Sequence, residues 1–269
     1  MNSTFIKGIL FSTLVVLYAF PWAQAQESKS IKLPDPTKKG GLSIMESFSK
    51  RSSSRSWADK ELSTQDLSNL LWAANGINRP ESKKRTAPSA MNVQEVDIYV
   101  FIKSGVYLYD AAGHALNLVS AGDHRSEIGM SMGARPSGGA SGTQGSAPGV
   151  MPGGSSPAPG GMLSAPPGGV TGASGGVAAG SSTAAANLIM VSDISKLQMG
   201  TDETKKELGI IDAALVSENI GLFCAGNGLA TVPRISTISN KDALKTLLKL
   251  KDTQYIVIEN GVGYPVETK

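Results

Sequence analysis

The sequence predicts an α+β fold in which an antiparallel meander is combined with long helices. Three short runs rich in β-branched and aromatic residues follow one another over 96–121, with polar turns between them. Apolar residues at helical spacing flank these runs, over 62–77 before them and 210–228 after them. A chain of 269 residues with 41% hydrophobic content can bury one sizeable core. One domain with appended segments is therefore expected.

The first predicted helix is the stretch LSTQDLSNLLWAANGI. Ser63, with Asp66 three residues later, is a capping signal for its N-terminus, and Gly76 stops it. Between them, four apolar residues recur at helical spacing: Leu67, Leu70, Leu71 and Ala74. The pattern predicts a helix with one buried face.

The meander consists of the strands VDIYVFI, GVYLYD and ALNLVSA, with turns at 103–105 and 110–113. Further along, NLIMVSD predicts another strand and IIDAALVSENIGLFCAGNG a long apolar helix ended by glycine. The run NKDALKTLLKL predicts a shorter helix from Asn240, and QYIVIENGVGYP a last strand.

Residues 1–25 are typical of a secretory signal. They contain an apolar run over 8–20, a breaking Pro21 and a small-x-small triplet at 23–25. The run is too short to span a bilayer comfortably, although an uncleaved anchor stays open as an alternative. The mature chain is expected to be exported to the periplasm or the extracellular space, with no membrane contact after cleavage. Its single cysteine, Cys224, has no partner for an intrachain disulfide.

Residues 131–183 are almost entirely Gly, Ser, Ala, Pro and Thr, without periodicity. Such a composition buries too little apolar surface to offset the entropy of ordering. We interpret it as a low-complexity, disordered insertion in one domain over 26–269, because its flanks look like parts of one domain; an interdomain linker is the alternative. The net charge of +3 is small for this length, which argues against nucleic-acid binding.

The chemistry-bearing residues are few. His114 and His124 lie in expected turns, Cys224 is distant in sequence, and no metal-ligand spacing occurs, so no metal is expected and both histidines are interpreted as surface loop residues. The sequence has no strained serine turn with a base and no dinucleotide fingerprint after a strand. An enzyme built on this chain would take its reactivity from a bound cofactor, and its catalytic residues stay unknown.

The run RSSSRSW places two arginines around three hydroxyl groups. Arg51 and Arg55 share a face both in a helical turn and in an extended segment, so both guanidinium groups can converge on one ligand. Such forks match phosphate oxygens, and serine hydroxyls supply further donors. A solvated basic linker is the alternative.

Six motifs occur in a characteristic order: LPDPTKKGGLSIMESFSKRSSSRSW, LSTQDLSNLLWAANGINR, KRTAPSAMNVQEVDIYVF, GVYLYD, ENIGLFCAGNGLATVPR and VGYP. In order and spacing they resemble the flavin-dependent nitroreductase superfamily, close to its SagB-type dehydrogenase branch. The resemblance implies an α+β sandwich with a central, mostly antiparallel sheet and flanking helices. It also implies a homodimer with two FMN sites shared between the chains.

The resemblance assigns binding roles to residues of three motifs. Contacts to the FMN phosphate, ribityl chain and pyrimidine edge fall on Arg51, Ser52, Ser53 and Arg55. The isoalloxazine ring would be lined from the partner subunit by Pro88, Ser89, Ala90, Met91 and Asn92. Glu218 and Arg234 are further candidate contacts, with a locally satisfied helix position and a salt bridge as the respective alternatives. Asp123 and Arg125 are interpreted as structural, and Cys224 as a core residue.

The expected function is that of an exported, FMN-dependent oxidoreductase transferring hydride between a small organic substrate and flavin N5. The low-complexity tract replaces a segment that lines the flavin pocket in relatives, which leaves two alternatives. One is a flavin-binding protein without catalysis, and the other is a secreted structural protein whose Gly/Ser/Pro tract is the functional part. Because NAD(P)H is absent outside the cytoplasm, oxidation of an organic substrate is favoured over nitro reduction.

Overall fold

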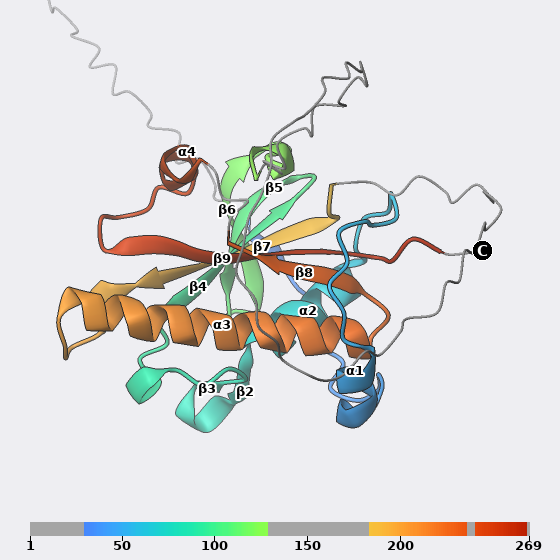
Figure 1. The fold of residues 1–269 in the computed structure, drawn as a ribbon, viewed down its shortest axis with the longest axis horizontal. Coiled ribbons are helices and arrows are strands. Elements are labelled where there is room, and N and C mark those ends of the chain that lie inside the picture. Colours follow the sequence, from blue (N-terminus) through green and yellow to red (C-terminus); the bar gives the residue numbers. More distant parts are fainter. Residues whose placement is uncertain (1–29, 129–182, 236–239, 268–269) are drawn as a thin grey trace, which may run out of the picture.

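A computed structural model describes residues 30–128, 183–235 and 240–267 (Figure 1). The predicted signal at 1–25 lies outside these residues, as does the predicted insertion at 131–183 apart from its last residue.

A seven-stranded antiparallel sheet forms the centre of the fold, in the order β1-β6-β5-β4-β7-β9-β8 (Figure 1). The strands are β1 (Ser30–Lys32), β4 (Val96–Ile102), β5 (Gly105–Asp110), β6 (Ala115–Ala121), β7 (Ala186–Asp193), β8 (Ala230–Arg234) and β9 (Gln254–Gly263). A separate two-stranded sheet pairs β2 (Ile77–Arg79) with β3 (Lys84–Arg85). The predicted meander and the two predicted later strands are confirmed. The edge strands β1 and β8 were not predicted.

Four α-helices accompany the sheet in the described residues: α1 (Ile44–Lys50), α2 (Thr64–Asn75), α3 (Asp202–Gly226) and α4 (Lys241–Leu247). The predicted caps are present, since Ser63 Oγ accepts from the Asp66 N–H at 3.0 Å and Asn240 Oδ1 from the Ala243 N–H at 3.2 Å. The predicted start of α3 at residue 210 was wrong. The helix begins at Asp202 and is capped by Thr201. The prediction missed its first turns because they are polar and lack the apolar spacing of the later turns.

The sheet is covered on both faces, as the alternation along β4 requires. Val96, Ile98 and Val100 pack with α2 and α3, whereas Tyr99 and Phe101 pack with α4 on the other face. In Figure 1, α3 and α2 accordingly lie below the sheet and α4 above it. The predicted sandwich of a central sheet with flanking helices is confirmed.

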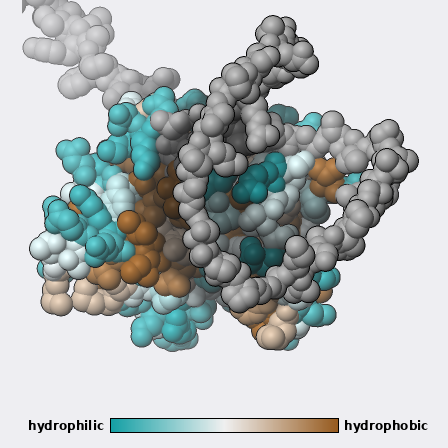
Figure 2. All heavy atoms as spheres, in the orientation of Figure 1, coloured by the Kyte–Doolittle hydropathy of each residue, from teal (hydrophilic) through white to brown (hydrophobic). Residues whose placement is uncertain are grey.

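The long helix α3 has one buried side and one exposed apolar side. Among the described residues it is the helix long and apolar enough to span a membrane, by length and composition only. It lies instead against the sheet, with Ala213, Val216 and Ile220 buried. On the outer side Ile210 and Ile211 are 51% and 56% exposed, and hydrophobic side chains gather along α3 in Figure 2. Neighbouring α1 exposes three more, Ile44, Met45 and Phe48.

The two flanks of residues 129–182 are joined by Arg125. Its Nη1 donates to the carbonyl oxygens of Ala184 at 3.2 Å and Ala185 at 3.4 Å. Its Nη2 pairs with Asp123 Oδ2 at 2.7 Å, which lowers the pKa of that carboxyl. The structural role predicted for Asp123 and Arg125 is confirmed, and both flanks belong to the same sheet.

His114 is not the surface loop residue that was predicted. Its ring is half-buried, with Nε2 2.7 Å from Ser68 Oγ and Nδ1 2.9 Å from the Tyr109 hydroxyl. Burial lowers the pKa of the imidazole. The turn places the ring between α2 and β5, a position that the residues around His114 in the sequence do not indicate.

Candidate functional site

The segment 51–55 connects the end of α1 to the edge strand β8. The N–H of Arg51 donates to the Ser47 carbonyl at 2.9 Å and closes α1. Ser53 then forms a parallel bridge with Thr231, whose carbonyl accepts from the Ser54 N–H at 2.9 Å. These bonds fix the backbone beside β8. The four predicted contacts here stay exposed: Arg51, Ser52, Ser53 and Arg55.

Both arginines of this segment keep their hydrogen-bonding groups free. Within the described part of the chain, neither the Arg51 nor the Arg55 guanidinium has a hydrogen-bond or ion-pair partner. Lys50 immediately precedes them. A guanidinium presents five N–H donors in a planar fork, so this short segment offers a strong, unneutralised set of donors to an anion.

A hollow of about 230 Å³ lies beside this segment. Its walls come from the segment itself (Lys50, Ser52, Ser54), from the C-terminal part of α3 (Gly221, Cys224, Ala225), from Leu229 and β8 (Ala230, Thr231), and from Pro265. Thr231 Oγ1 is buried and has no hydrogen-bond partner in the described residues. Because buried hydroxyls are rarely left unpaired, this atom points to a ligand or water in the hollow.

The donor set and the orphaned hydroxyl fit a phosphate-bearing ligand such as FMN. Cations and hydroxyl groups are the usual partners of phosphate oxygens. The hollow is smaller than the roughly 300–1,000 Å³ of sites that enclose a drug-sized ligand. One chain therefore offers room for part of a flavin nucleotide rather than for all of it.

The second predicted motif, Pro88 to Asn92, forms a loop anchored on α3. The Ala90 N–H donates to Asp212 Oδ2 at 2.7 Å, and the Gln94 N–H donates to Ser89 Oγ at 3.0 Å. Three residues have φ in the left-handed region, Met91 (51°), Asn92 (57°) and Gln94 (57°). Each such non-glycine residue costs about 1–3 kcal/mol and persists only where its surroundings hold it. The bond to Asp212 is one of the contacts that do so.

Of the two remaining predicted contacts, Glu218 is exposed on α3 and Arg234 is bound within the fold. Arg234 donates to the buried Glu259 carboxylate through Nε at 2.7 Å and Nη2 at 2.9 Å, and its guanidinium lies 5.8 Å from the centre of the Trp57 ring. Asn187 Nδ2 donates to the same carboxylate at 3.0 Å. Arg234 thus forms the salt bridge that was the alternative to a phosphate contact.

The structure does not bring the two motifs together within one chain. The hollow beside residues 51–55 meets α3 at Gly221, Cys224 and Ala225, whereas the Pro88–Asn92 loop meets it at Asp212. Asp212 and Cys224 are twelve residues apart in this helix, which at 1.5 Å per residue is about 18 Å. The Pro88–Asn92 loop therefore meets the middle of α3, and the hollow lies near its C-terminal end.

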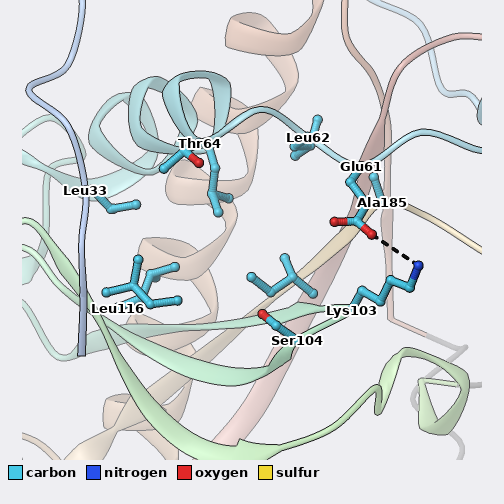
Figure 3. Close-up of a pocket in the computed structure, with 11 residues that line it drawn as sticks. Leu33, Glu61, Leu62, Thr64, Lys103, Ser104, Leu116 and Ala185 are labelled. Atoms are coloured by element: carbon cyan, nitrogen blue, oxygen red, sulfur yellow. Dashed lines mark ion pairs between the residues drawn. The ribbon is translucent and has the colours of Figure 1, made fainter. Parts of the chain in front are cut away.

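A second hollow, of about 210 Å³, lies between β1, the start of α2 and the β4–β5 turn (Figure 3). Leu33, Leu62 and Leu116 point into it, and the ion pair of Lys103 with Glu61, at 3.4 Å, lies at one side. None of the predicted site residues lines this hollow. It is separate from both motifs.

Sequence reasoning missed three residues that the structure adds to these regions. Lys50 adjoins the basic run, so its position was a usable signal. Thr231 and Asp212 are single polar residues in apolar stretches, and nothing local distinguishes them. They were found only because tertiary packing places one beside residues 51–55 and the other against the Pro88–Asn92 loop.

Comparison with known proteins identifies the fold. The sequence matches the model of the Nitroreductase family over residues 48–264. A candidate nitroreductase from Ralstonia eutropha JMP134 is similar, with a TM-score of 0.66 and 25% identity over 90% of this chain and 92% of that one. A candidate nitroreductase from Anabaena variabilis ATCC 29413 has a TM-score of 0.57 and 16% identity, over 88% of this chain and 42% of that one. A chain of the E. coli microcin synthetase complex has a TM-score of 0.53 and 15% identity, over 94% of this chain and 84% of that one.

The last two likenesses concern the fold alone, and no curated protein matches the chain. The family match spans every predicted site residue, from Arg51 to Arg234, and the structure has the α+β sandwich that the sequence motifs predicted. The chain belongs to the Nitroreductase family.

Proposed function

We propose that this chain is an exported, FMN-dependent oxidoreductase, close to the SagB-type dehydrogenases, that transfers hydride between a small organic substrate and flavin N5. Membership of the Nitroreductase family supports an oxidoreductase. The observation that carries the cofactor is the hollow lined by Thr231, whose hydroxyl is orphaned, and by Lys50, in a segment that also carries the unpaired Arg51 and Arg55. When bound, FMN would supply the hydride-transfer chemistry.

The protein's own part is to bind and orient the nucleotide. Arg51 and Arg55 pair with phosphate oxygens, and Lys50 adds a third cation. Ser52 and Thr231 supply hydroxyl donors from two sides of the hollow. Charge-assisted hydrogen bonds contribute about 1.5–3 kcal/mol each, so the two arginines together account for much of the affinity.

A homodimer would complete the site. The motifs meet α3 about 18 Å apart, and α3 with α1 presents an apolar outer surface: Ile210, Ile211, Leu215, Ile44, Met45 and Phe48. When two copies pack these surfaces about a two-fold axis that crosses α3 at right angles near Glu218, the two α3 helices run antiparallel, and Asp212 of one chain lies opposite Cys224 of the other. The Pro88–Asn92 loop of one chain then faces the hollow of its partner, which joins the two halves of the flavin site.

Export determines the direction of the reaction in this proposal. Residues 1–25 are typical of a secretory signal, and the domain over 26–269, interrupted by the tract at 131–183, would act in the periplasm or outside the cell. NAD(P)H is not available there. Oxidation of an organic substrate, with electrons passed on to a second acceptor, therefore fits the compartment better than nitro reduction.

The first experiment is to replace Arg51 and Arg55 with alanine in the mature protein and to measure FMN affinity and circular dichroism. Losing at least one charge-assisted bond from each arginine predicts a dissociation constant at least about a hundredfold higher, with the fold unchanged because both side chains are exposed.

The matched control replaces Lys241 and Lys245, an exposed pair with the same spacing on α4, across the sheet from the site. It should keep full affinity. A wild-type protein that holds no flavin overturns the proposal, and one that holds flavin but turns over no substrate is the flavin-binding alternative.

A hybrid dimer tests the shared site. One chain carries Arg51→Ala with Arg55→Ala, and the other carries Ser89→Ala with Asn92→Gly. If each site draws on both chains, the hybrid has one intact and one doubly altered site and binds about one FMN per dimer, while each altered homodimer binds little. A hybrid that binds no more than the altered homodimers would place the cofactor within one chain.

A further inference from the structure

The carboxyl group of Glu95 is buried without a hydrogen-bond donor. Glu95 directly precedes β4 and is 0% exposed, and neither of its oxygens has a partner among the described residues. Its neighbour is another buried carboxyl, that of Asp212 on α3, which is 5% exposed. Two carboxylates repel one another in a dry site, so the pair is stable only with a proton between them.

The charges around Glu95 do not remove the need for that proton. Asp212 faces it from α3, Tyr255 from β9 and Lys196 from the 3₁₀ turn η4 (Ile194–Lys196). Lys196 Nζ is bound to Asp97 at 3.3 Å, and the Tyr255 hydroxyl donates to the Lys206 carbonyl at 2.7 Å. Burial and then Asp212 raise the pKa of Glu95 to about 7, against the opposing effect of Lys196.

Asp212 connects this pair to the Pro88–Asn92 loop. Its Oδ2 accepts the Ala90 N–H at 2.7 Å, in a loop where Met91, Asn92 and Gln94 have left-handed backbones. A change at the Asp212 carboxyl therefore acts on a strained segment.

We propose that Glu95 and Asp212 share one proton and that this proton keeps the Pro88–Asn92 loop against α3, which makes Glu95 a positioning residue for the loop. The protonated Glu95 donates its O–H to the Asp212 carboxylate, which accepts the Ala90 N–H at the same time. Release of the proton to solvent leaves two repelling carboxylates, Asp212 shifts away, and the loop opens. The consequence for flavin rests on the proposed function, whereas the shared proton does not.

The test is hydrogen–deuterium exchange of the full chain over a series of pH values, corrected for the intrinsic pH dependence of exchange. In the wild type, protection of the amides of residues 89–94 should fall by up to about tenfold per pH unit as the pH rises from the pKa of the pair in the open loop to its higher pKa in the closed loop, because one proton is linked to opening, and it should level off above that range. In Glu95→Gln the side-chain amide donates to Asp212 at every pH. Protection should then stay constant.

The control Asp110→Asn alters a half-buried carboxyl on β5, keeps the oxygen that accepts the Ala112 N–H, and should keep the wild-type dependence. If Glu95→Gln does not fold, Asp212→Asn replaces it. Its carbonyl oxygen still accepts the Ala90 N–H and its amide donates to Glu95, so constant protection is again expected. A wild-type slope in the variant that folds, or no slope in the wild type, overturns the inference.

The same samples separate this inference from the proposed function. FMN retained per chain should fall over the same pH range in the wild type and stay constant in Glu95→Gln. If the protein binds no FMN but the exchange behaves as described, the inference holds and the proposed function fails. If FMN is bound and the variant keeps the wild-type exchange, the proposed function holds and the inference fails.

Discussion

Replacing Arg234 with methionine leaves the Glu259 carboxylate buried beside a single donor. In the wild type, Arg234 provides two charge-assisted bonds of 2.7 and 2.9 Å, and Asn187 provides one of 3.0 Å. Glu259 is 0% exposed, so no water replaces the lost donors. Methionine fills part of the volume over Trp57 without restoring charge.

Removing one partner of a buried pair costs about 3–5 kcal/mol. That is a large share of the roughly 5–15 kcal/mol that stabilises a typical domain. We expect the free energy of unfolding of Arg234→Met, measured in urea by circular dichroism, to fall by about this amount. The double variant Arg234→Met with Glu259→Leu removes the stranded charge and should recover most of the loss.

The loss should depend on pH with a definite sign. Burial raises the pKa of Glu259 against the lowering effects of Arg234 and Asn187, so removing Arg234 raises it further. A carboxyl whose folded pKa exceeds its unfolded value stabilises the fold at low pH, and this contribution disappears as the pH rises through the folded pKa. The deficit of the variant should therefore be smaller near pH 5 than near pH 8.

Two results would refute this reasoning: a loss below about 1 kcal/mol, which is the range of an exposed pair, or a double variant no more stable than the single one. Flavin content gives a separate answer on Arg234 as a phosphate contact. If Arg234→Met is folded at low pH and still loses FMN, the arginine contacts the cofactor as well as Glu259.

Four further changes test the packing and the proposed dimer. A Cβ at Gly209 would lie 2.2 Å from the Ser192 and Tyr255 hydroxyl oxygens, so Gly209→Ala should lower the free energy of unfolding in urea by about 1–3 kcal/mol. Gly221 lies in the same helix, and the atom nearest to an added Cβ there is 3.8 Å away, so Gly221→Ala should raise the free energy of unfolding by about 0.5–1 kcal/mol. Ser63→Ala removes the cap of α2 and should lower the free energy of unfolding by about 1 kcal/mol. Ile211→Glu places a charge on the exposed face of α3 and should give a monomer without flavin by size-exclusion chromatography with absorbance detection; a flavin-loaded dimer would contradict the shared site.

The parts of the fold that the sequence predicts are those with strong local patterns. In β4 the alternation of Val96, Ile98 and Val100 with Tyr99 and Phe101 specifies a strand buried on both faces, whatever its partners. The edge strands were missed because they are short. β1 has three residues and β8 contains Pro233, so pairing across the sheet decides their conformation more than their own residues do.

The candidate site divides in the same way. Arg51 and Arg55 are only four residues apart in the sequence, so their donors form a recognisable group before any folding. Glu95 and Asp212 are on separate elements, and a glutamate before an apolar strand is normally interpreted as solvent-exposed. Only the packing of α3 onto the sheet makes them neighbours. Their carboxyl chemistry is a product of tertiary structure and leaves no local signature.

The contact between Arg125 and Ala184 also makes the position of residues 129–182 suitable for inserting a foreign domain. Residues 128 and 184 are both buried at the margin of the sheet, and the guanidinium holds the two chain ends at a fixed separation. Any segment inserted between residues 128 and 184 begins and ends at the same two anchored positions, and its length changes the loop-closure entropy only slowly. We therefore expect a reporter domain whose termini lie close together to replace residues 129–182 with every strand in place, at a position remote in sequence from the Arg51–Arg55 segment.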